Sequence, residues 1–532
     1  MDARSGAGQT STTQTRAGAP TRVAGGAMWV LGLVIMIDAT DQSIVRGIVP
    51  QIKSAFHVGD LAIGVLMSSF VAVNGLVTVP AGYLADRWRR NRTIGHTVIG
   101  WSGITALTAT APNFGLLVGI RTLLGFGQAV TEPSAGSLLA DIYPLAQRGR
   151  AFAVQQCLSF VGFGLGVSIA AQIATHLGWR YAFLLVGLPG ALIALACYRI
   201  REPKRGHSDR LHAGVAGDDE ADAPVDLLAD GVGGFVRDMV AGLKADLRTI
   251  LGIRTMRYAL VGIATLLFSI TAISAWLPEF YRRQEHLSQG AATSAFTILA
   301  VVAGPAAILV GGWLADRFAT VVKGARVALP AYYILFGNTL FMVSYLHLSF
   351  GPAYALQFVG LFVMALSVPA LRAGLSDAVP ANLRGAGFAA FNLMSVLFGT
   401  AAAPVVVSLF AQTFGGDLRT AFLIVTPPVF IGALILLRAR HHLDADAARI
   451  FAAVLSAAQA EQDRKAARAR RPQDAQVDLR SGQGAQGSQG HADGGGDPAA
   501  AAVQVPLDDN GGAGGDDQRE ERSLQVVTEP QG

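Results

Sequence analysis

The sequence predicts an all-α integral membrane protein with twelve transmembrane helices arranged in two pseudo-symmetric six-helix halves. The first observation is composition, because 52% of the 532 residues are hydrophobic and 15% are charged, against roughly 25% charged in soluble domains. The second is the repeated occurrence of apolar runs of about 20 residues, each long enough to cross a bilayer. The third is a pair of motifs that recurs in the same order in each half.

Twelve apolar segments define the predicted spans, and polar segments separate and flank them. The spans are expected at 28–50, 61–85, 94–112, 115–140, 151–174, 180–199, 257–280, 291–316, 326–347, 352–376, 385–412 and 419–438. This gives a disordered N-terminus over 1–27, a first half over 28–199, a second half over 257–440, and a mostly disordered tail over 441–532. The linker 200–256 carries apolar residues at helical spacing after 235, which indicates an amphipathic helix on the inner membrane surface.

Basic residues mark alternate loops, and their asymmetry predicts the topology. They concentrate at 87–92, 148–150, 199–205, 317–326, 384 and 438–440, whereas the opposite loops carry few. Because cytoplasmic loops are enriched in Lys and Arg, we expect both termini in the cytoplasm of a multi-pass protein of the plasma (inner) membrane. The exceptions on the opposite side are Lys53, Arg180, Arg282, Arg283 and Arg419.

Two motifs repeat between the halves. GYLADR at 82–87 returns as GWLADR at 312–317, and a pattern of Pro, Asp, Pro, Arg-Gly and Phe at 133–152 returns at 369–388. This repeat resembles the signature loops of the major facilitator superfamily, in which two six-helix halves bind a substrate between them. In that family such loops latch the cytoplasmic side shut, although Arg89 stands here where the family most often has Gly. The resemblance implies a cytoplasmic gate formed by Gly82, Asp86, Arg87, Arg90, Arg148, Gly312, Asp316, Arg317 and Arg384.

Ionisable residues inside the first span form a second group of candidates. An ionisable residue within a span is costly to bury, so it indicates function by default. At about 100° per residue, Asp38 and Asp41 lie about 60° apart, and Arg46 lies about 80° from Asp38. We therefore expect the carboxylates to share a face and Arg46 to pair with either of them.

The fourth span carries a polar stripe. At the same rotation of about 100° per residue, four of its residues lie within about 60° of one another around the helix, namely Arg121, Gly125, Gln128 and Glu132. One interpretation is a polar cavity lining in which Arg121 meets Asp38 or Asp41 and in which Asp41 or Glu132 carries a proton. The alternative is an ion-pair network that only holds helices together. Asn74 and Asn392 either line the pathway or satisfy the backbone of a neighbouring helix.

Three stretches are similar to the Spinster-type branch of the superfamily. They are the segment from Asp41 through GYLADR, the segment from Arg121 to Val154, and the segment that begins at Leu177. This resemblance implies transport of lysolipids, in some members with protons, and places Asp41 and Arg121 at the branch's characteristic acid and arginine positions. Two positions depart, since the branch usually has Arg at position 42 and Glu at position 128, where this chain has Gln.

The predicted function is secondary active transport by alternating access of an amphipathic or anionic organic solute such as a lysolipid, with proton coupling as an open option. A drug/proton antiporter, an organic-anion symporter and a non-transporting membrane sensor are the alternatives. No nucleotide loop, metal cluster or nucleophile constellation indicates an enzyme, and no cofactor, metal or nucleic-acid partner is expected. The expected partners are a small-molecule or lipid substrate, the bilayer and protons, for a monomeric protein.

Overall fold

A computed structural model describes residues 22–85, 89–143, 145–203, 251–319, 325–371 and 393–442, with single residues at 234, 237, 240, 241, 244, 248, 445, 446 and 448. All of these belong to one compact unit, Met1–Ala458, and the second unit, Gln459–Gly532, lies outside the described residues. Among the described residues the secondary structure is helical, with no strand.

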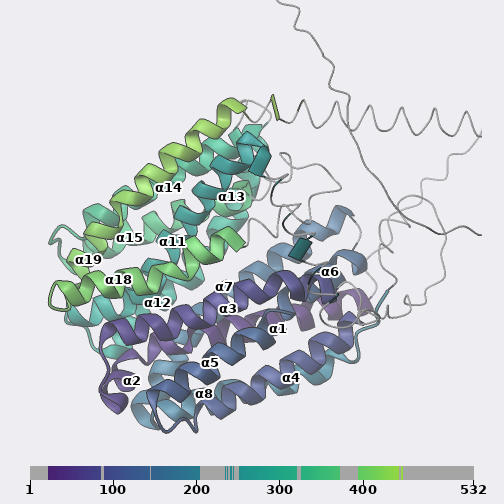
Figure 1. The fold of residues 1–532 in the computed structure, drawn as a ribbon, viewed down its shortest axis with the longest axis horizontal. Helices are drawn as coiled ribbons and strands as arrows, with labels where there is room; N and C mark the ends of the chain where they lie inside the picture. The colour runs from purple at the N-terminus through teal and green to yellow at the C-terminus, as the bar shows by residue number, and fades with distance from the viewer. Residues whose placement is uncertain are drawn as a thin grey trace, which may run out of the picture. The chain divides into compact units, whose positions relative to one another are not determined.

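The described part of the first half contains seven long or medium helices and one short one, which Figure 1 labels α1 to α8. Their bounds are α1 Arg22–Gly47, α2 Val49–Phe56, α3 Asp60–Ala85, α4 Arg90–Thr108, α5 Phe114–Gln128, α6 Thr131–Ile142, α7 Leu145–His176 and α8 Trp179–Cys197. Helix α1 begins six residues before the predicted span, so residues 22–27, assigned to a disordered N-terminus, are helical. The rest of that terminus lies outside the described residues.

The second half repeats this pattern with two π-helical segments. Its elements are α11 Arg254–Arg283, α12 Gln289–Ile298, η1 Leu299–Ala303, α13 Gly304–Ala319, α14 Ala325–Ser344, α15 Phe350–Ala365, η3 Ser395–Thr400, α18 Ala402–Thr413 and α19 Leu418–Val425, after which helix continues to His442. Side-chain caps fix three starts, at Asn113, Ser288 and Asp417, each of which accepts a hydrogen bond from a backbone N–H of the following turn. In the linker, the described single positions from 234 to 248 are helical and the remainder lies outside the described residues.

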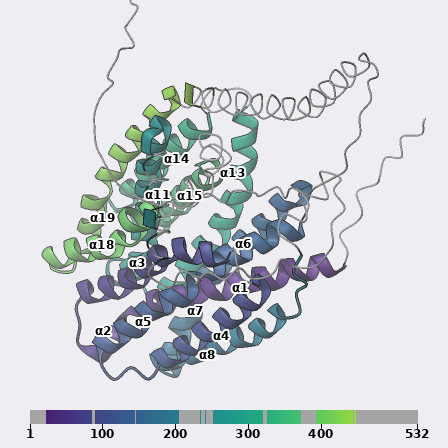
Figure 2. The ribbon, with the colours of Figure 1, turned by 45° about the vertical axis from the view of Figure 1, so that its right-hand side comes forward.

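The predicted twelve-helix membrane fold is confirmed. Eleven segments of the described chain are long and apolar enough to cross a bilayer, with α5 and α6 joined in one of them and α12, η1 and α13 in another. The remaining predicted span corresponds to α4, a 19-residue helix that opens with Arg90, Asn91 and Arg92. These polar residues lower its mean hydropathy, but α4 packs along α8, and the two lie side by side in Figures 1 and 2.

Glycines allow α1 and α7 to approach closely. A Cβ added at Gly162 would lie 2.0 Å from the carbonyl oxygen of Met36, and one at Gly166 would lie 2.6 Å from that of Thr40. Because real side chains essentially never make such contacts, these positions of α7 require glycine. The close approach packs the face of α1 that carries Met36 and Thr40 against α7, which leaves Asp38 and Asp41 on a different face of α1.

The two halves contact one another through α3 with α18 and through α7 with α12, η1 and α13. All hydrogen bonds between the halves among the described residues involve residues 47–60 and 164–168 on one side and 283–297 on the other. We call the end of the molecule that carries the loops 57–59 and 284–288 the closed end. Polar contacts therefore fasten the halves at this end of the described structure.

Candidate functional site

A buried ion pair lies inside the first half. Nη1 of Arg121 on α5 lies 3.2 and 3.3 Å from the two carboxylate oxygens of Asp41 on α1, and Nη2 donates to the backbone carbonyl of Asp41 at 3.2 Å. Asp41 is fully buried and Arg121 is 2% exposed. Arg121 therefore pairs with Asp41, one of the two carboxylates that the sequence analysis predicted as its partner.

Two neutral side chains complete the surroundings of Asp41. Thr105 on α4 donates its hydroxyl to Oδ1 at 3.0 Å, and Nε2 of Gln128 on α5 donates to Oδ2 at 2.9 Å. The Arg121 guanidinium also lies over the rings of Phe70 and Phe183, 5.5 and 5.4 Å from their centroids. Aromatic faces attract a cation, so this packing supports the pair in a dry environment.

The predicted pairing of Arg46 with a carboxylate is wrong for the described residues. Its Nη1 donates instead to the backbone carbonyl of Gln42 at 2.6 Å, and its guanidinium lies 4.7 Å from the ring centroid of Phe163 on α7. Its Nε is buried and has no hydrogen-bond partner among the described groups. Helical angles place a residue on a face but do not set the direction of its side chain, and the Arg46 side chain lies over Phe163 on α7.

Asp38 also lacks a cationic partner in the described part of the chain. Its Oδ2 accepts a hydrogen bond from Nε2 of Gln42 at 2.9 Å, and its buried Oδ1 has no partner. Asp38 nevertheless lies close enough to Asp41 and Glu132 for their charges to interact, as Arg46 does to Arg121. The five groups form one electrostatic cluster in which only Asp41 and Arg121 are directly paired.

A small cavity of about 20 Å³ connects the two arginines. Its lining combines three polar side chains with aliphatic and aromatic ones, namely Gln42, Val45, Arg46, Leu66, Met67, Phe70, Val71 and Arg121. Two guanidinium groups beside apolar walls suit a ligand that has both an anionic and an apolar part.

Glu132 does not join the polar stripe of α5 as the continuous-helix arithmetic predicts. Helix α5 ends at Gln128, a turn follows at Ala129 and Val130, and Glu132 lies in the first turn of α6 with an exposed side chain. No hydrogen bond or ion pair links it to Arg121 within the described structure. Arg121, Gly125 and Gln128 precede the turn and share the buried face as expected.

Asn74 contacts the backbone of a neighbouring helix, which was one of its two predicted roles. Its Nδ2 donates to the carbonyl of Gly125 at 3.4 Å, and a Cβ added at Gly125 would lie 2.8 Å from the carbonyl oxygen of Phe70. Gly125 is therefore the close-approach point of α3 and α5. Asn392, the matching candidate in the second half, lies outside the described residues.

Arg90 is the gate candidate with the most fully described contacts. It is 1% exposed, forms an ion pair with Asp141 on α6, and lies 3.1 Å from Oε1 of Glu202. It also donates to the hydroxyl of Ser137 at 3.0 Å. Ser137 and Asp141 belong to the first half and Glu202 lies just after it, so Arg90 holds α4, α6 and the segment after α8 together in this state.

The remaining gate candidates are only partly described. Gly312 lies on α13 with open space beside it, and Arg317 is exposed in the last turn of α13. Three more candidates lie in described helices, but only their backbone is described. They are Gly82 in α3, Arg148 in α7 and Asp316 in α13. The other three candidates, Asp86, Arg87 and Arg384, lie wholly outside the described residues.

A charge network at the closed end was missed by the sequence analysis. Arg283 of α11 makes two contacts with the carboxylate of Asp60 on α3, at 2.8 and 2.7 Å, and Lys53 lies 2.7 Å from the same carboxylate. Glu279 accepts from Arg282 and Arg283, each at 2.6 Å. The network joins the two halves, and its signal in the sequence was the presence of three basic residues that break the loop asymmetry.

Comparison with known proteins places these features in a family. The family model described as Major Facilitator Superfamily matches residues 31–402. "Protein spinster" of Drosophila melanogaster is 24% identical over 395 residues, covering 72% of this chain, and the "Probable L-galactonate transporter" of Escherichia coli (strain K12) is 24% identical over 305 residues, covering 57%. The chain spans 61% and 64% of the length of these two relatives.

Among solved structures, a bacterial homologue of the human lysosomal transporter Spinster, in an inward-facing and unoccupied conformation, matches with a TM-score of 0.60. The match has 20% sequence identity and covers 82% of this chain and 98% of that structure. At this identity the match shows the fold. The expected resemblance to the Spinster-type branch is confirmed, and the relatives and the fold are those of transporters rather than enzymes.

Proposed function

Because this chain belongs to the major facilitator superfamily and is a multi-pass membrane transporter, we propose that it carries an amphipathic organic anion by alternating access. Lysolipids are the first substrate class to test, because the Spinster-type resemblance implies them. The two half-domains would each move as a unit, with the substrate bound between them near mid-membrane.

One observation carries the proposal, namely that no carboxylate among the described residues directly contacts the buried guanidinium of Arg46. An unpaired cation buried in a membrane protein is energetically costly, whereas Arg121 beside it is already matched by Asp41. In this state the adjoining cavity of about 20 Å³ has room for about one water molecule, so a substrate would enter only once the cavity widens. In a wider cavity an anionic headgroup would give Arg46 a direct partner, and Val45, Leu66, Met67 and Val71 would contact an apolar chain. A neutral drug would give the guanidinium of Arg46 no charged partner, so this arrangement favours an anionic substrate.

The described conformation supports an inward-facing assignment. The basic loops predict that the closed end faces away from the cytoplasm. With Asp60 and Arg283 fastening that end, we propose that the substrate site is reached from the cytoplasmic side in this state, as in the inward-facing Spinster homologue. Both termini would then be cytoplasmic, and the motif loops at 82–92 and 312–317 would close the cytoplasmic side in the alternate state.

Proton coupling is proposed for the carboxylates of the same cluster. Asp41 has its charge matched by Arg121, whereas Asp38 has no cationic partner among the described residues and a proton would neutralise it. A proton on Asp38 would also reduce its repulsion of an incoming anion at the neighbouring cavity. Asp41 and Glu132 remain candidates, since moving Arg121 would expose Asp41 and Glu132 is accessible in this state.

Counterflow into proteoliposomes tests the proposed function. We would compare lysophosphatidylglycerol, lysophosphatidylcholine and galactonate in wild type and Arg46→Gln, with Arg180→Gln as the matched control. Arg180 donates to the carbonyl of Ala111 and lies outside the cluster. We expect the wild type to exchange lysophosphatidylglycerol, and Arg46→Gln to lower the rate about tenfold, because hydrogen bonds to charged groups contribute about 1.5–3 kcal/mol.

The outcomes separate the alternatives. Preferential exchange of galactonate would favour an organic-anion symporter, a reading supported by the similarity to the L-galactonate transporter. Binding of these compounds without exchange would favour the sensor. Equal loss in Arg46→Gln and Arg180→Gln, or no loss in Arg46→Gln, would contradict the assignment of Arg46 as the anion-binding group.

A further inference from the structure

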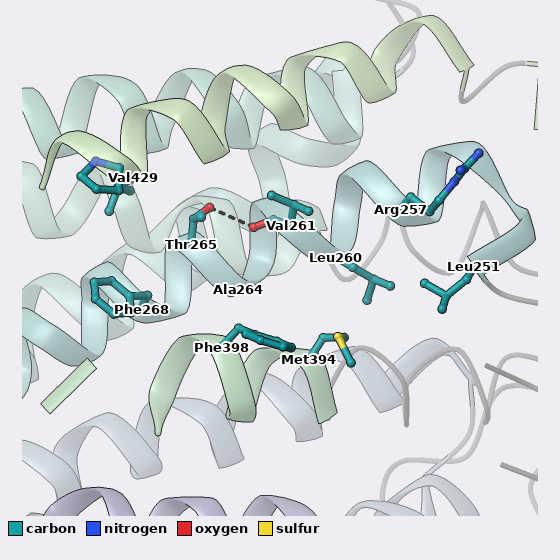
Figure 3. Close-up of a pocket in the computed structure, with 11 residues that line it drawn as sticks. Leu251, Arg257, Leu260, Val261, Ala264, Thr265, Phe268, Met394, Phe398 and Val429 are labelled. Atoms are coloured by element: carbon teal, nitrogen blue, oxygen red, sulfur yellow. Dashed lines mark hydrogen bonds between the residues drawn. The ribbon is translucent and has the colours of Figure 1, made fainter. Parts of the chain in front are cut away.

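A second cavity lies in the other half, away from the charged cluster. It is a groove of about 560 Å³ on α11, flanked by η3 and by the helix that follows α19. Figure 3 shows Phe268 and Val429 at one end of the groove and Leu251 and Arg257 at the other. The lining residues are Leu251, Arg257, Leu260, Val261, Ala264, Thr265, Phe268, Met394, Phe398, Pro428 and Val429.

Local irregularities of the backbone open this groove. Segment η3 is a π-helix, whose wider turn displaces Phe398 and leaves it 64% exposed. On the opposite wall the chain bends after Val425, before Pro427 and Pro428. The gap between these walls exposes the stripe of α11 that carries Val261 and Thr265, at helical spacing from Arg257.

The groove is almost wholly apolar, and its few polar groups have distinct roles. The hydroxyl of Thr265 is satisfied by the carbonyls of Val261 and Gly262. Arg257 is exposed near the start of α11 and forms no ion pair with any described residue. Among the described lining residues, the groove is an apolar trough with the guanidinium of Arg257 at its mouth, at the end of a membrane-spanning helix.

The volume fits one fatty acyl chain. Because an apolar cavity of about 150 Å³ holds benzene, a groove of this size has room for about 20 carbon atoms. Apolar matching alone does not select a ligand inside a membrane, since lipid tails are as apolar as leucine. Selection must come from the charge at the mouth, and a cation at the membrane surface attracts anionic headgroups.

We propose that this groove binds one acyl chain of an anionic bilayer phospholipid, whose phosphate pairs with Arg257. The site is separate from the transport cluster, which lies in the first half around Asp41 and Arg121. It is formed by α11, η3 and the helix after α19, so a bound lipid would bridge three helices of the second half. The proposal does not depend on which solute the protein transports.

Native mass spectrometry of the full-length protein tests this site. The protein would be titrated with dioleoylphosphatidylglycerol and with dioleoylphosphatidylcholine, which have the same chains but differ in net charge. We expect tighter binding of phosphatidylglycerol, weakened about fivefold by Arg257→Gln, which removes one cation that attracts the anionic lipid. Val261→Trp, which fills the groove from a partly exposed position, should weaken both lipids.

Three further variants serve as controls for the lipid-binding measurement. Arg254→Gln removes an exposed cation one turn from Arg257, Leu309→Trp enlarges an exposed side chain on α13, and Arg46→Gln alters the transport cavity. All three should keep phosphatidylglycerol affinity within about twofold of the wild type, less than the loss of one cation contact. Equal affinity for the two lipids, unchanged affinity in Arg257→Gln or Val261→Trp, or an equal loss in Arg46→Gln would overturn the proposal.

Discussion

At the scale of single residues, the buried pair of Arg121 and Asp41 admits two interpretations. It could hold α1 and α5 together, or it could be a working part of the transport site. The two differ in what a neutral replacement does, because a structural pair can often be exchanged for uncharged groups without loss of stability. The contacts from Thr105 and Gln128 show that Asp41 has several neutral partners in addition to the cation.

Arg121→Ala should leave a buried carboxylate unpaired and lower the free energy of unfolding by about 3 kcal/mol. The double variant with Arg121→Gln and Asp41→Asn should recover much of this stability yet remain inactive. Arg121→Lys should recover activity only partly, because an ammonium group lacks the forked geometry of guanidinium. Thermal unfolding and counterflow would be measured on the same preparations, and transport by the neutral double variant would assign the pair a purely structural role.

The carboxylates give a second prediction at this scale. If a proton is carried at Asp38, Asp38→Asn should abolish gradient-driven accumulation while exchange of substrate for substrate persists, since exchange needs no net proton movement. Asp41→Asn should impair both activities, because it also leaves Arg121 unpaired. Glu132→Gln tests the third candidate carboxylate, on the exposed side of the cluster, and gradient-driven uptake by all three variants would mean that none of them couples protons.

At the scale of helices, the sequence predicted where the spans lie better than which side chains meet. Hydropathy located the spans because membrane thickness fixes their length. Arg46 and Glu132 were misplaced for local reasons, namely a side chain that extends toward Phe163 and a turn at Ala129 and Val130. The only sequence signal for the groove on α11 was the pair Pro427 and Pro428 at the helix bend, since the π-helical turn of η3 arises from packing.

The basic residues that break the loop asymmetry have a physical explanation in the folded helices. Lys53, Arg282 and Arg283 are matched by Asp60 and Glu279, and Arg419 lies 3.0 Å from Glu285. Three carboxylates therefore offset most of the charge of these four cations at the closed end. Only a structure could reveal this matching, because Asp60 and Arg283 are 223 residues apart in the chain.

The link between α3 and α11 gives a prediction for the conformational equilibrium. Asp60→Asn should weaken the closed end and shift the population about tenfold toward its opening, because each hydrogen bond to a charged group contributes about 1.5–3 kcal/mol. Spin labels at Ala55 and His286, both exposed on opposite halves, would report a longer distance. Glu285→Gln is the control, since its partner Arg419 lies in the same half; an equal lengthening there would contradict a specific role for Asp60.

At the scale of the whole transporter unit, the two halves have different properties. The first half contains the buried charges Asp41, Arg121, Asp38 and Arg46, whereas the described part of the second half presents the apolar groove on α11. The contacts between Asp60 and Arg283 hold the two halves together at the closed end. The ion pairs of Arg90 do not involve the second half and stabilise the first half. This arrangement suits two rigid bodies that rock about a central site, as alternating access requires.

The most direct test of alternating access is to measure two distances in the same protein by double electron–electron resonance. One pair of labels, at Ala55 and His286, reports the closed end, and a second pair, at the exposed Arg92 and Phe318, reports the opposite end. On addition of lysophosphatidylglycerol we predict that the first distance lengthens while the second shortens. Two distances that stay fixed while the ligand binds, or that change in the same direction, would contradict the account.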